Sequence, residues 1–276
     1  MNDKERVDTA LVRRGYFESR ERAQSSIMAG LVYIGEKKVN KPSETVGADE
    51  QLNVRANSMI YVSRGALKLE KAVRVFNAEL QDKVIMDIGA STGGFTDICL
   101  REGARRVYSI DVGYGQLDWK IRNDPRVTVM ERVNARYMKK EDFPEKPSIT
   151  VMDVSFISIR LILPVAIDIM GDDGIIYTLI KPQFEAGRKN VGKKGVVRDP
   201  EIHNDVIISI AEYAGSIGWC VEDIDYSPIT GPEGNIEFIA KIRKKNDDIQ
   251  SVDINRIRDK VREAHENLGR KSNGEK

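Results

Sequence analysis

The stretch DIGASTGGF, residues 87–95, decides the fold of this chain. It follows an apolar run, Lys83–Ile88, that has the composition of a buried strand, and it leads into a helical pattern over Thr92–Glu102. Glycines at a strand-to-helix junction permit a sharp turn and let the backbone approach a ligand closely. The stretch therefore predicts a cofactor-binding loop at the carboxyl end of a strand in an α/β domain.

The residues of this loop favour one cofactor over another. A dinucleotide loop reads G-x-G-x-x-G and brings helix amides onto a pyrophosphate, whereas here the spacing is G-x-x-x-G-G, preceded by Asp87. A carboxylate there repels a pyrophosphate but suits the cationic amino group of S-adenosyl-L-methionine, so we favour that cofactor over NAD, or over a purely structural turn. Asp111, at the end of the next strand, can accept both ribose hydroxyls. The candidate cofactor-binding residues are Asp87, Gly89, Ala90, Ser91, Gly93, Gly94, Phe95 and Asp111.

Outward from the loop, apolar runs alternate with helical patterns. Strands are predicted over residues 106–112, 127–131, 149–154, 174–180, 220–226 and 236–242, and helices over 63–79 and 161–170 and from Pro200 onward, with Asp199 as N-cap. This alternation predicts a mostly parallel sheet covered on both faces. The last two strands are joined by about nine residues, too few for a parallel crossover, so they should pair antiparallel. The expected fold class is α/β, a doubly wound Rossmann-like sheet with one antiparallel strand, which by analogy is the methyltransferase variant.

A smaller unit of another kind precedes this sheet. Val7, Ala10 and Leu11 predict a helix that stops near Gly15, and Ser19 can cap a second helix that ends at Gly30. Residues 31–39 and 51–54 predict a hairpin and a closing strand. We expect a small α+β domain over 1–57, a linker at 58–62, the α/β domain over 63–245, and a C-terminal amphipathic helix and tail at 246–276.

Basic residues gather locally, although the formal net charge is only +1. Between Lys181 and Arg198, Glu185 is the only acidic residue that opposes the cations. Arg and Lys are the usual contacts to phosphate. An ordinary solvated surface or flexible loop is the alternative. The predicted RNA-binding residues are Arg6, Arg13, Arg14, Arg20, Arg22, Lys41, Arg64, Arg188, Lys189 and Lys193.

Four charged residues are predicted to meet at the carboxyl edge of the sheet, where sites form in open α/β folds. Asp153 and Lys181 end two strands, Glu237 begins the antiparallel strand, and Lys68 lies on the helix that leads into the sheet. A ribose hydroxyl attacks only after losing its proton, and a free lysine, with a pKa of about 10.4, is already protonated. A second lysine and burial would lower a lysine pKa, while two carboxylates orient the pair.

The motifs of both units resemble known families. The N-terminal pattern, which includes Arg6-Val7-Asp8, Ser19-Arg20 and Lys41-Pro42-Ser43, resembles the αL-type RNA-binding domain of small-subunit ribosomal protein S-four and implies binding to structured RNA. The whole chain resembles the TlyA family of ribosomal RNA methyltransferases, whose catalytic domain is of the FtsJ type. That resemblance rests on the motifs at 63–69, 87–96, 153–158, 181–184 and 233–237.

The TlyA resemblance assigns roles and a substrate. It maps a Lys-Asp-Lys-Glu tetrad onto Lys68, Asp153, Lys181 and Glu237, makes Lys181 the general base, and places Asp153 and Phe156 beside the cofactor. It implies 2′-O-methylation of cytidine, with ribosomal RNA or ribosomal subunits as the partner.

Other functions are disfavoured by the residues present. Base-methylating enzymes usually carry a Pro-Pro-aromatic run where this chain has Asp153-Val154-Ser155-Phe156, and carbon methylation needs a cysteine nucleophile. Cys99 and Cys220 show no metal-ligand spacing, so no metal is expected. The longest apolar runs are far shorter than a membrane span, and a cytoplasmic protein is the default expectation. A non-catalytic RNA-binding or ribosome-assembly factor and a membrane-active haemolysin stay open as alternatives.

Overall fold

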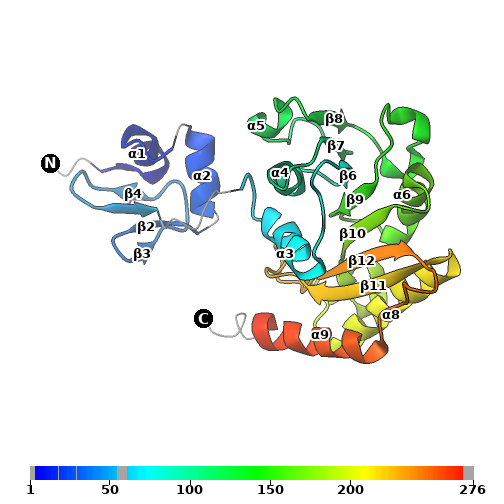
Figure 1. Ribbon diagram of the computed structural model, residues 1–276. Helices are drawn as coiled ribbons and strands as arrows, with labels where there is room; N and C mark the ends of the chain where they lie inside the picture. Colours follow the sequence, from blue (N-terminus) through cyan, green and yellow to red (C-terminus); the bar gives the residue numbers. More distant parts are fainter. Residues whose placement is uncertain (1–3, 18, 29, 55–60, 270–276) are drawn as a thin grey trace. The chain divides into compact units, whose positions relative to one another are not determined.

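The computed structural model describes residues 4–17, 19–28, 30–54 and 61–269. The chain divides into two compact units, Met1–Tyr61 and Val62–Lys276. Figure 1 shows unit 1 in blue and unit 2 from cyan to red. Each unit has a hydrophobic core of its own, so each is described separately.

Unit 1 is built from two helices and short strands. Its elements are β1 (Glu5–Arg6), α1 (Val7–Arg13), α2 (Arg20–Met28), β2 (Val32–Ile34), β3 (Lys37–Lys38), β4 (Thr45–Val46) and β5 (Leu52–Val54). The helix pair and the three-stranded sheet β3-β2-β5 agree with the prediction, whereas the two-stranded β1-β4 sheet was not predicted. Gly15 and Gly30, which follow the two helices, have φ values of 77° and 74°. These left-handed conformations suit glycine and explain why the helices stop there.

Unit 2 contains one seven-stranded sheet with helices on both sides. Its strands are β6 (Val84–Ile88), β7 (Arg106–Asp111), β8 (Val127–Glu131), β9 (Ile149–Met152), β10 (Ile175–Ile180), β11 (Trp219–Tyr226) and β12 (Phe238–Lys244). Their order is β11-β12-β10-β9-β6-β7-β8. Only β12 runs against its neighbours, β10 and β11, so the predicted single antiparallel strand is confirmed.

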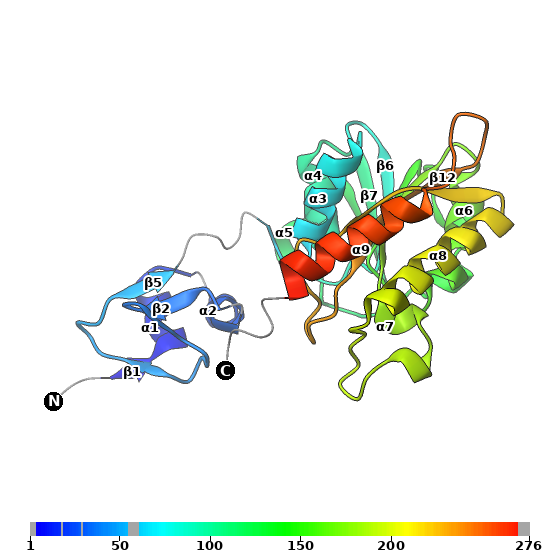
Figure 2. The same ribbon diagram turned by 90° about the horizontal axis from the view of Figure 1, so that it is seen from below.

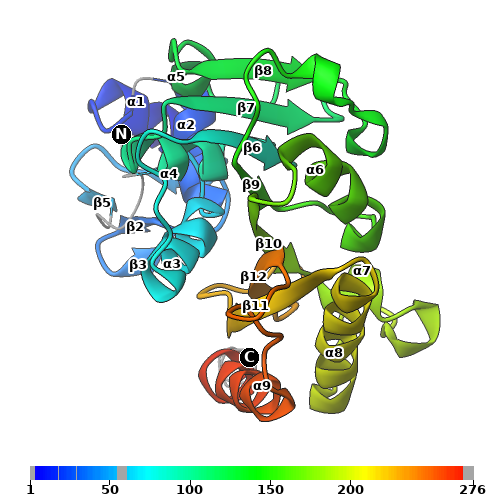
Figure 3. The same ribbon diagram turned by 45° about the vertical axis from the view of Figure 1, so that its right-hand side comes forward.

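The helices of unit 2 cover both faces of its sheet. They are α3 (Ala66–Phe76), α4 (Gly94–Arg101), α5 (Trp119–Arg122), α6 (Leu163–Met170), α7 (Pro182–Glu185), α8 (Pro200–Ser216) and α9 (Ile254–Leu268). Helices α3 and α4 lie on one side of the sheet and α6 and α8 on the other (Figure 3). Helix α9 packs against α8 and β11 (Figure 2).

The helices of unit 2 differ from the sequence prediction at α3 and after β10, and α4 and α6 are shorter than predicted by one or two residues at an end. The helix expected over 63–79 begins only at Ala66 and ends at Phe76, because Asn77 adopts a left-handed conformation with φ 48°. The segment after β10, predicted as a loop, starts with the short helix α7, whose first residue is Pro182. Proline is favoured at that position because its fixed φ suits the first helical turn.

Candidate active site

Four elements of unit 2 bring the predicted tetrad together. Asp153 directly follows β9, Lys181 directly follows β10, and Glu237 directly precedes the antiparallel β12. These three positions share one edge of the sheet because β12 runs opposite to β10. Lys68 reaches the same edge from the first turn of α3, which contacts β12.

The tetrad is a buried, charge-balanced cluster. Lys68 Nζ lies 2.7 Å from Glu237 Oε2 and 3.3 Å from Asp153 Oδ2. Lys181 Nζ lies 2.6 Å from Asp153 Oδ1, so Asp153 bridges the two lysines. Glu237 is 2% exposed and both lysines are 8% exposed. Removing any one member would leave a net charge that the other three buried groups do not balance, which is unfavourable.

The electrostatics of Lys68 correct one expectation from the sequence. Burial would lower the pKa of Lys68, but the carboxylates of Asp153 and Glu237 outweigh burial and raise that pKa above its ordinary value. The expectation that burial and a neighbouring lysine lower the pKa is therefore wrong for Lys68, which stays protonated. Two carboxylates contact Lys68, whereas Lys181 contacts one carboxylate and a hydroxyl, that of Ser155 at 2.8 Å.

Two residues beside Lys181 were missed by sequence reasoning. Lys181 Nζ donates to Ser155 Oγ and lies 6.0 Å from the ring centroid of Phe184. Phe184 in turn contacts Phe156, with ring centroids 5.1 Å apart. Both missed residues belong to the motifs that carry the resemblance, and that membership was the available signal. Phe156 is 91% exposed with φ 64°, a strained conformation for an aromatic residue.

The glycine loop is packed directly against the tetrad. Gly89 has φ 85°, and a Cβ there would lie 2.7 Å from the carbonyl oxygen of Asp153, so only glycine allows this approach. On the other side, Asp111 accepts backbone hydrogen bonds from Ser91 (2.8 Å) and Gly113 (2.7 Å). The loop thus connects the end of β7 to the tetrad across the end of β6.

Some predicted cofactor-binding residues lie inside the protein. Asp87 is fully buried and accepts a 2.6 Å hydrogen bond from the hydroxyl of Thr96. Burial raises the pKa of Asp87 to about 7, against the lowering effect of Thr96. Gly94 and Phe95 are also buried. Ala90 and Gly93 are buried as well, whereas Ser91 is exposed. A carboxylate at residue 87 therefore acts from beneath the loop and not at its surface.

The arginines of unit 1 are held by its own acids and carbonyls. Arg6 and Arg20 form ion pairs with the buried Asp8 at 2.9 Å and 3.0 Å, and Arg13 pairs with Glu5. Arg14 donates to the carbonyl oxygens of residues 47 and 50. About half of the Arg6 and Arg20 side chains stays exposed, so their outer faces are accessible. Arg22 and Lys41 are both at least partly exposed.

The basic segment, defined here as residues 187–197, lies beyond Lys181 in unit 2. Its predicted RNA-binding residues, Arg188, Lys189 and Lys193, are exposed, as is Arg64. Glu185 does not oppose them, contrary to expectation. Its side chain is 2% exposed, accepts from Ser158 Oγ and the Ile159 amide, and has a pKa raised by burial.

The described residues also bear on metal binding and on membrane insertion. No group of three or more His, Cys, Asp or Glu residues that could hold a metal ion occurs among residues 4–17, 19–28, 30–54 and 61–269. In the same part of the chain, no helix has both the length and the apolar character required to cross a membrane.

Comparison with known proteins identifies the family. Models of the S4 domain and of the FtsJ-like methyltransferase match residues 5–52 and 61–244. The chain is 47% identical to YqxC of Bacillus subtilis (strain 168), provisionally named an rRNA methyltransferase, over 97% of this chain and 96% of that protein. It is 42% identical to the 16S/23S rRNA (cytidine-2′-O)-methyltransferase TlyA of Mycobacterium tuberculosis (strain ATCC 25618 / H37Rv), over 88% and 91% of the two chains.

A solved structure gives the same result. The protein from Streptococcus thermophilus, provisionally named a hemolysin, is 45% identical, with 98% of each chain covered and a TM-score of 0.78. The chain therefore belongs to the TlyA-type family of rRNA methyltransferases, in which an S4 domain precedes an FtsJ-like methyltransferase domain that uses S-adenosylmethionine as methyl donor.

Proposed function

We propose that this protein methylates the 2′-hydroxyl of a cytidine in ribosomal RNA in the cytoplasm, with Lys181 as the general base. The observation that carries the proposal is the buried cluster of Lys68, Asp153, Lys181 and Glu237 at the carboxyl edge of the sheet. The relative from Mycobacterium tuberculosis is named for this reaction, and it shares 42% of aligned residues with this chain.

The contacts of the two lysines support Lys181 as the base. A neutral amine at Lys68 would leave the buried Glu237 without a cation, whereas a neutral amine at Lys181 would leave Asp153 still paired with Lys68. Lys181 Nζ can then accept the proton of the 2′-hydroxyl, and Asp153 stabilises the ammonium that results. General-base groups of this kind contribute typically about 10²–10⁴-fold to the rate.

The cofactor loop fits a nucleoside without phosphates. It contains no Lys or Arg between residues 87 and 95 that would pair a pyrophosphate. Asp111 keeps lone pairs for ribose hydroxyls, because each of its oxygens accepts one backbone amide. When bound, S-adenosylmethionine supplies an electrophilic methyl group on sulfur. Ala90, Ser91 and Asp111 would hold it, and the contact of Gly89 with Asp153 would keep it beside the tetrad.

We expect RNA to bind the exposed cations of unit 1 and of the basic segment. The exposed outer faces of Arg6 and Arg20, with Arg188, Lys189 and Lys193, provide cations for phosphate contacts. Because such contacts position RNA without reading sequence, the choice of nucleotide must come from the residues around the tetrad.

Transfer of tritiated methyl groups tests the proposal. Purified ribosomal subunits and deproteinised ribosomal RNA are incubated with labelled S-adenosylmethionine and wild-type, Lys181→Ala or Lys241→Ala protein. Lys241 is the matched control, because it is another largely buried lysine with one carboxylate partner, Glu222 at 3.1 Å. We expect Lys181→Ala to lose about a hundredfold or more of the rate, and Lys241→Ala to keep it.

The position of the label completes the test. Label on a cytidine 2′-oxygen, made by the wild type and the control alone, supports both the reaction and the base. Bound cofactor without transfer to any of these RNAs would remove the ribosomal assignment and favour a binding or assembly role.

A further inference from the structure

The two histidines of the chain, His203 and His265, form a hydrogen-bonded pair between α8 and α9. His203 Nδ1 lies 2.9 Å from His265 Nε2, and His203 is fully buried. His203 Nε2 lies 3.2 Å from the carbonyl oxygen of Val197, the last residue of the basic segment. The tetrad mechanism uses neither histidine. The two ring nitrogens of His203 are bonded to the carbonyl oxygen of Val197 and to the second imidazole ring.

The hydrogen-bond directions in this pair are determined by Val197. A carbonyl oxygen can only accept, so His203 Nε2 carries the proton and its Nδ1 is the bare nitrogen. His265 Nε2 must therefore donate to His203 Nδ1. His203 is neutral in this arrangement, because a proton added to its Nδ1 would place a charge at a fully buried site with no acid among its hydrogen-bond partners.

Val197 is also hydrogen-bonded to the segment that precedes β12 and contains Glu237. Its amide donates to Oδ1 of Asn235 at 3.0 Å, and Nδ2 of Asn235 donates to the carbonyl oxygen of Gly195 at 2.9 Å. Asn235 is 3% exposed and stands two residues before Glu237. A continuous chain of bonds thus runs from α9 through α8 and the basic segment to Asn235, two residues before Glu237.

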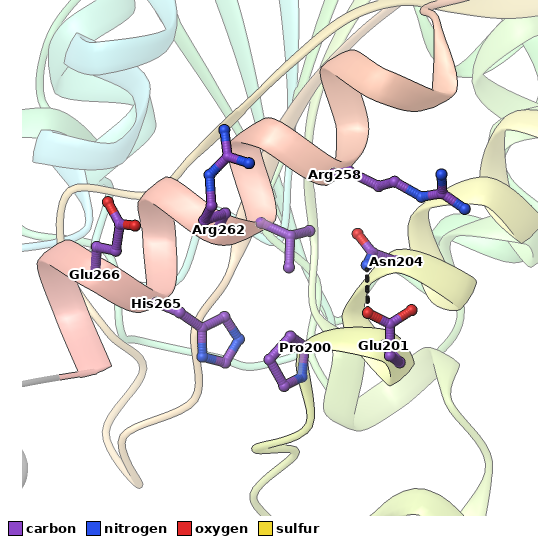
Figure 4. Close-up of a pocket in the computed structure, with 8 residues that line it drawn as sticks. Pro200, Glu201, Asn204, Arg258, Arg262, His265 and Glu266 are labelled. Carbon is purple, nitrogen blue, oxygen red and sulfur yellow. Dashed lines mark hydrogen bonds between the residues drawn. The ribbon is translucent and has the colours of Figure 1, made fainter.

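The surroundings of the histidine pair contain charges of both signs. His265, Pro200 and Glu201 line a hollow of about 390 Å³ between α8 and α9, with Arg258, Arg262 and Glu266 on the α9 side (Figure 4). His265 also lines a second hollow with Arg64 and Arg198. Burial and His265 lower the pKa of His203 to about 4, against the raising effects of the Val197 carbonyl and of Asp199. Burial likewise lowers the pKa of His265.

We propose that this chain of bonds is a latch that holds the basic segment in place for RNA only while α9 is docked and His203 is neutral. The RNA part of this inference rests on the proposed function. Asn235 and His203 are positioning residues, since they act through the backbone of residues 195–197 and touch no reacting atom. Opening of the latch would free the carbonyl of Val197 and loosen the segment next to Glu237.

Hydrogen exchange of the full-length protein without RNA tests the latch directly. Below about pH 6.5 the open form binds protons that the closed form excludes, so acid favours opening. After correction for intrinsic rates, the opening constant of α9 and of residues 195–197 should rise about tenfold between pH 7.5 and pH 5.5. In His203→Gln the rise should vanish, because glutamine can donate to Val197, accept from His265 and take up no proton.

A matched control removes a different bond of the same helix. Tyr213→Phe deletes the 2.9 Å bond from the Tyr213 hydroxyl to the carbonyl of Arg160 and should keep the wild-type pH dependence. A flat wild-type profile, or an equal rise in His203→Gln, would overturn the latch.

Steady-state kinetics test its effect on RNA. At pH 7.5, Asn235→Ala should raise the KM for RNA about tenfold, the equivalent of one or two missing hydrogen bonds, with kcat and the cofactor dissociation constant within about twofold of wild type. The wild-type KM should also rise at pH 5.5 and that of His203→Gln should not. An unchanged KM in Asn235→Ala would overturn the link to RNA. Absence of methyl transfer in every protein would remove the proposed function, and hydrogen exchange would still decide the latch.

Discussion

Asp87 is a carboxyl group enclosed beneath the cofactor loop, near the end of β6. The hydroxyl of Thr96 donates to its Oδ2 and also bonds to Ser109 at 2.8 Å. Burial raises the pKa of Asp87 to about 7 from an ordinary value of 3.8. The protonated form therefore stabilises the fold, and that stabilisation is lost as the pH rises from about 4 to about 7.

Replacing Asp87 by asparagine should expose this contribution. Asp87→Asn keeps the shape and cannot ionise, so relative to wild type its free energy of unfolding should increase by about 4 kcal/mol from pH 4 to pH 8. Denaturant titrations at several pH values measure the difference. Asp168→Asn, which changes a carboxylate that is 67% exposed, is the control and should show almost no trend. A constant difference across this range would mean that Asp87 is ionised throughout.

The same measurement separates Asp87 from the histidine latch. His203 has a lowered pKa, so its contribution is complete above about pH 6.5 and is lost as the pH falls towards 4. The two groups change stability in opposite directions over nearly the same range. Wild type alone can therefore look insensitive to pH, and the single variants are needed.

At the scale of elements, the positive charge of the basic segment is not balanced, because the side chain of Glu185 is buried in the protein. Glu185 accepts from Ser158 and is buried, and no Asp or Glu occurs between residues 187 and 197 to balance the cations. A strand end, a short helix and a basic turn thus follow one another, from Lys181 to Lys194. This order keeps the cations near Lys181 along the chain.

Salt dependence should count the phosphates that this segment pairs. In Lys193→Ala/Lys194→Ala, the slope of log affinity for RNA against log salt should become shallower by about 0.7–0.9 for each phosphate that is no longer neutralised. Filter binding between roughly 50 and 200 mM salt measures the slope. The adjacent pair Lys139→Ala/Lys140→Ala is the control, because Lys140 lies elsewhere on unit 2 and pairs with Asp168. Equal slopes in both variants would contradict a role for the segment.

At the scale of the whole molecule, the two units have separate cores and should respond separately. Asp8 joins α1 to α2 by accepting from Arg6, Arg20 and Gln24, and hydrogen bonds from Arg6 hold its pKa well below the usual range. Asp8→Asn would remove the buried carboxylate that pairs these half-exposed arginines, at a cost of about 2 kcal/mol for hydrogen bonds to a charged group. Hydrogen exchange of the full chain should then rise in α1 and α2 and stay constant in β6 and β7. An equal rise in both units would show that they unfold as one.

Several features of the fold and site could be predicted from local sequence. The spacing of the glycines after β6, the short connection predicted before the last strand and the strand-end positions of Asp153, Lys181 and Glu237 were enough to predict the fold class, the antiparallel strand and the tetrad's meeting point. Helix limits were less accurate at α3, because Asn77 takes a left-handed conformation that its residue type permits but does not require.

Other features depend on contacts between residues far apart in the chain. The raised pKa of Lys68 depends on carboxylates 85 and 169 positions away, and the inward turn of Glu185 depends on Ser158. The histidine latch joins residues 62 positions apart. Sequence by itself determined which residue types stand at the strand ends, because hydrophobic periodicity and turn chemistry act locally. Only tertiary structure decided which of those groups are buried together, and burial with a particular partner sets their charge.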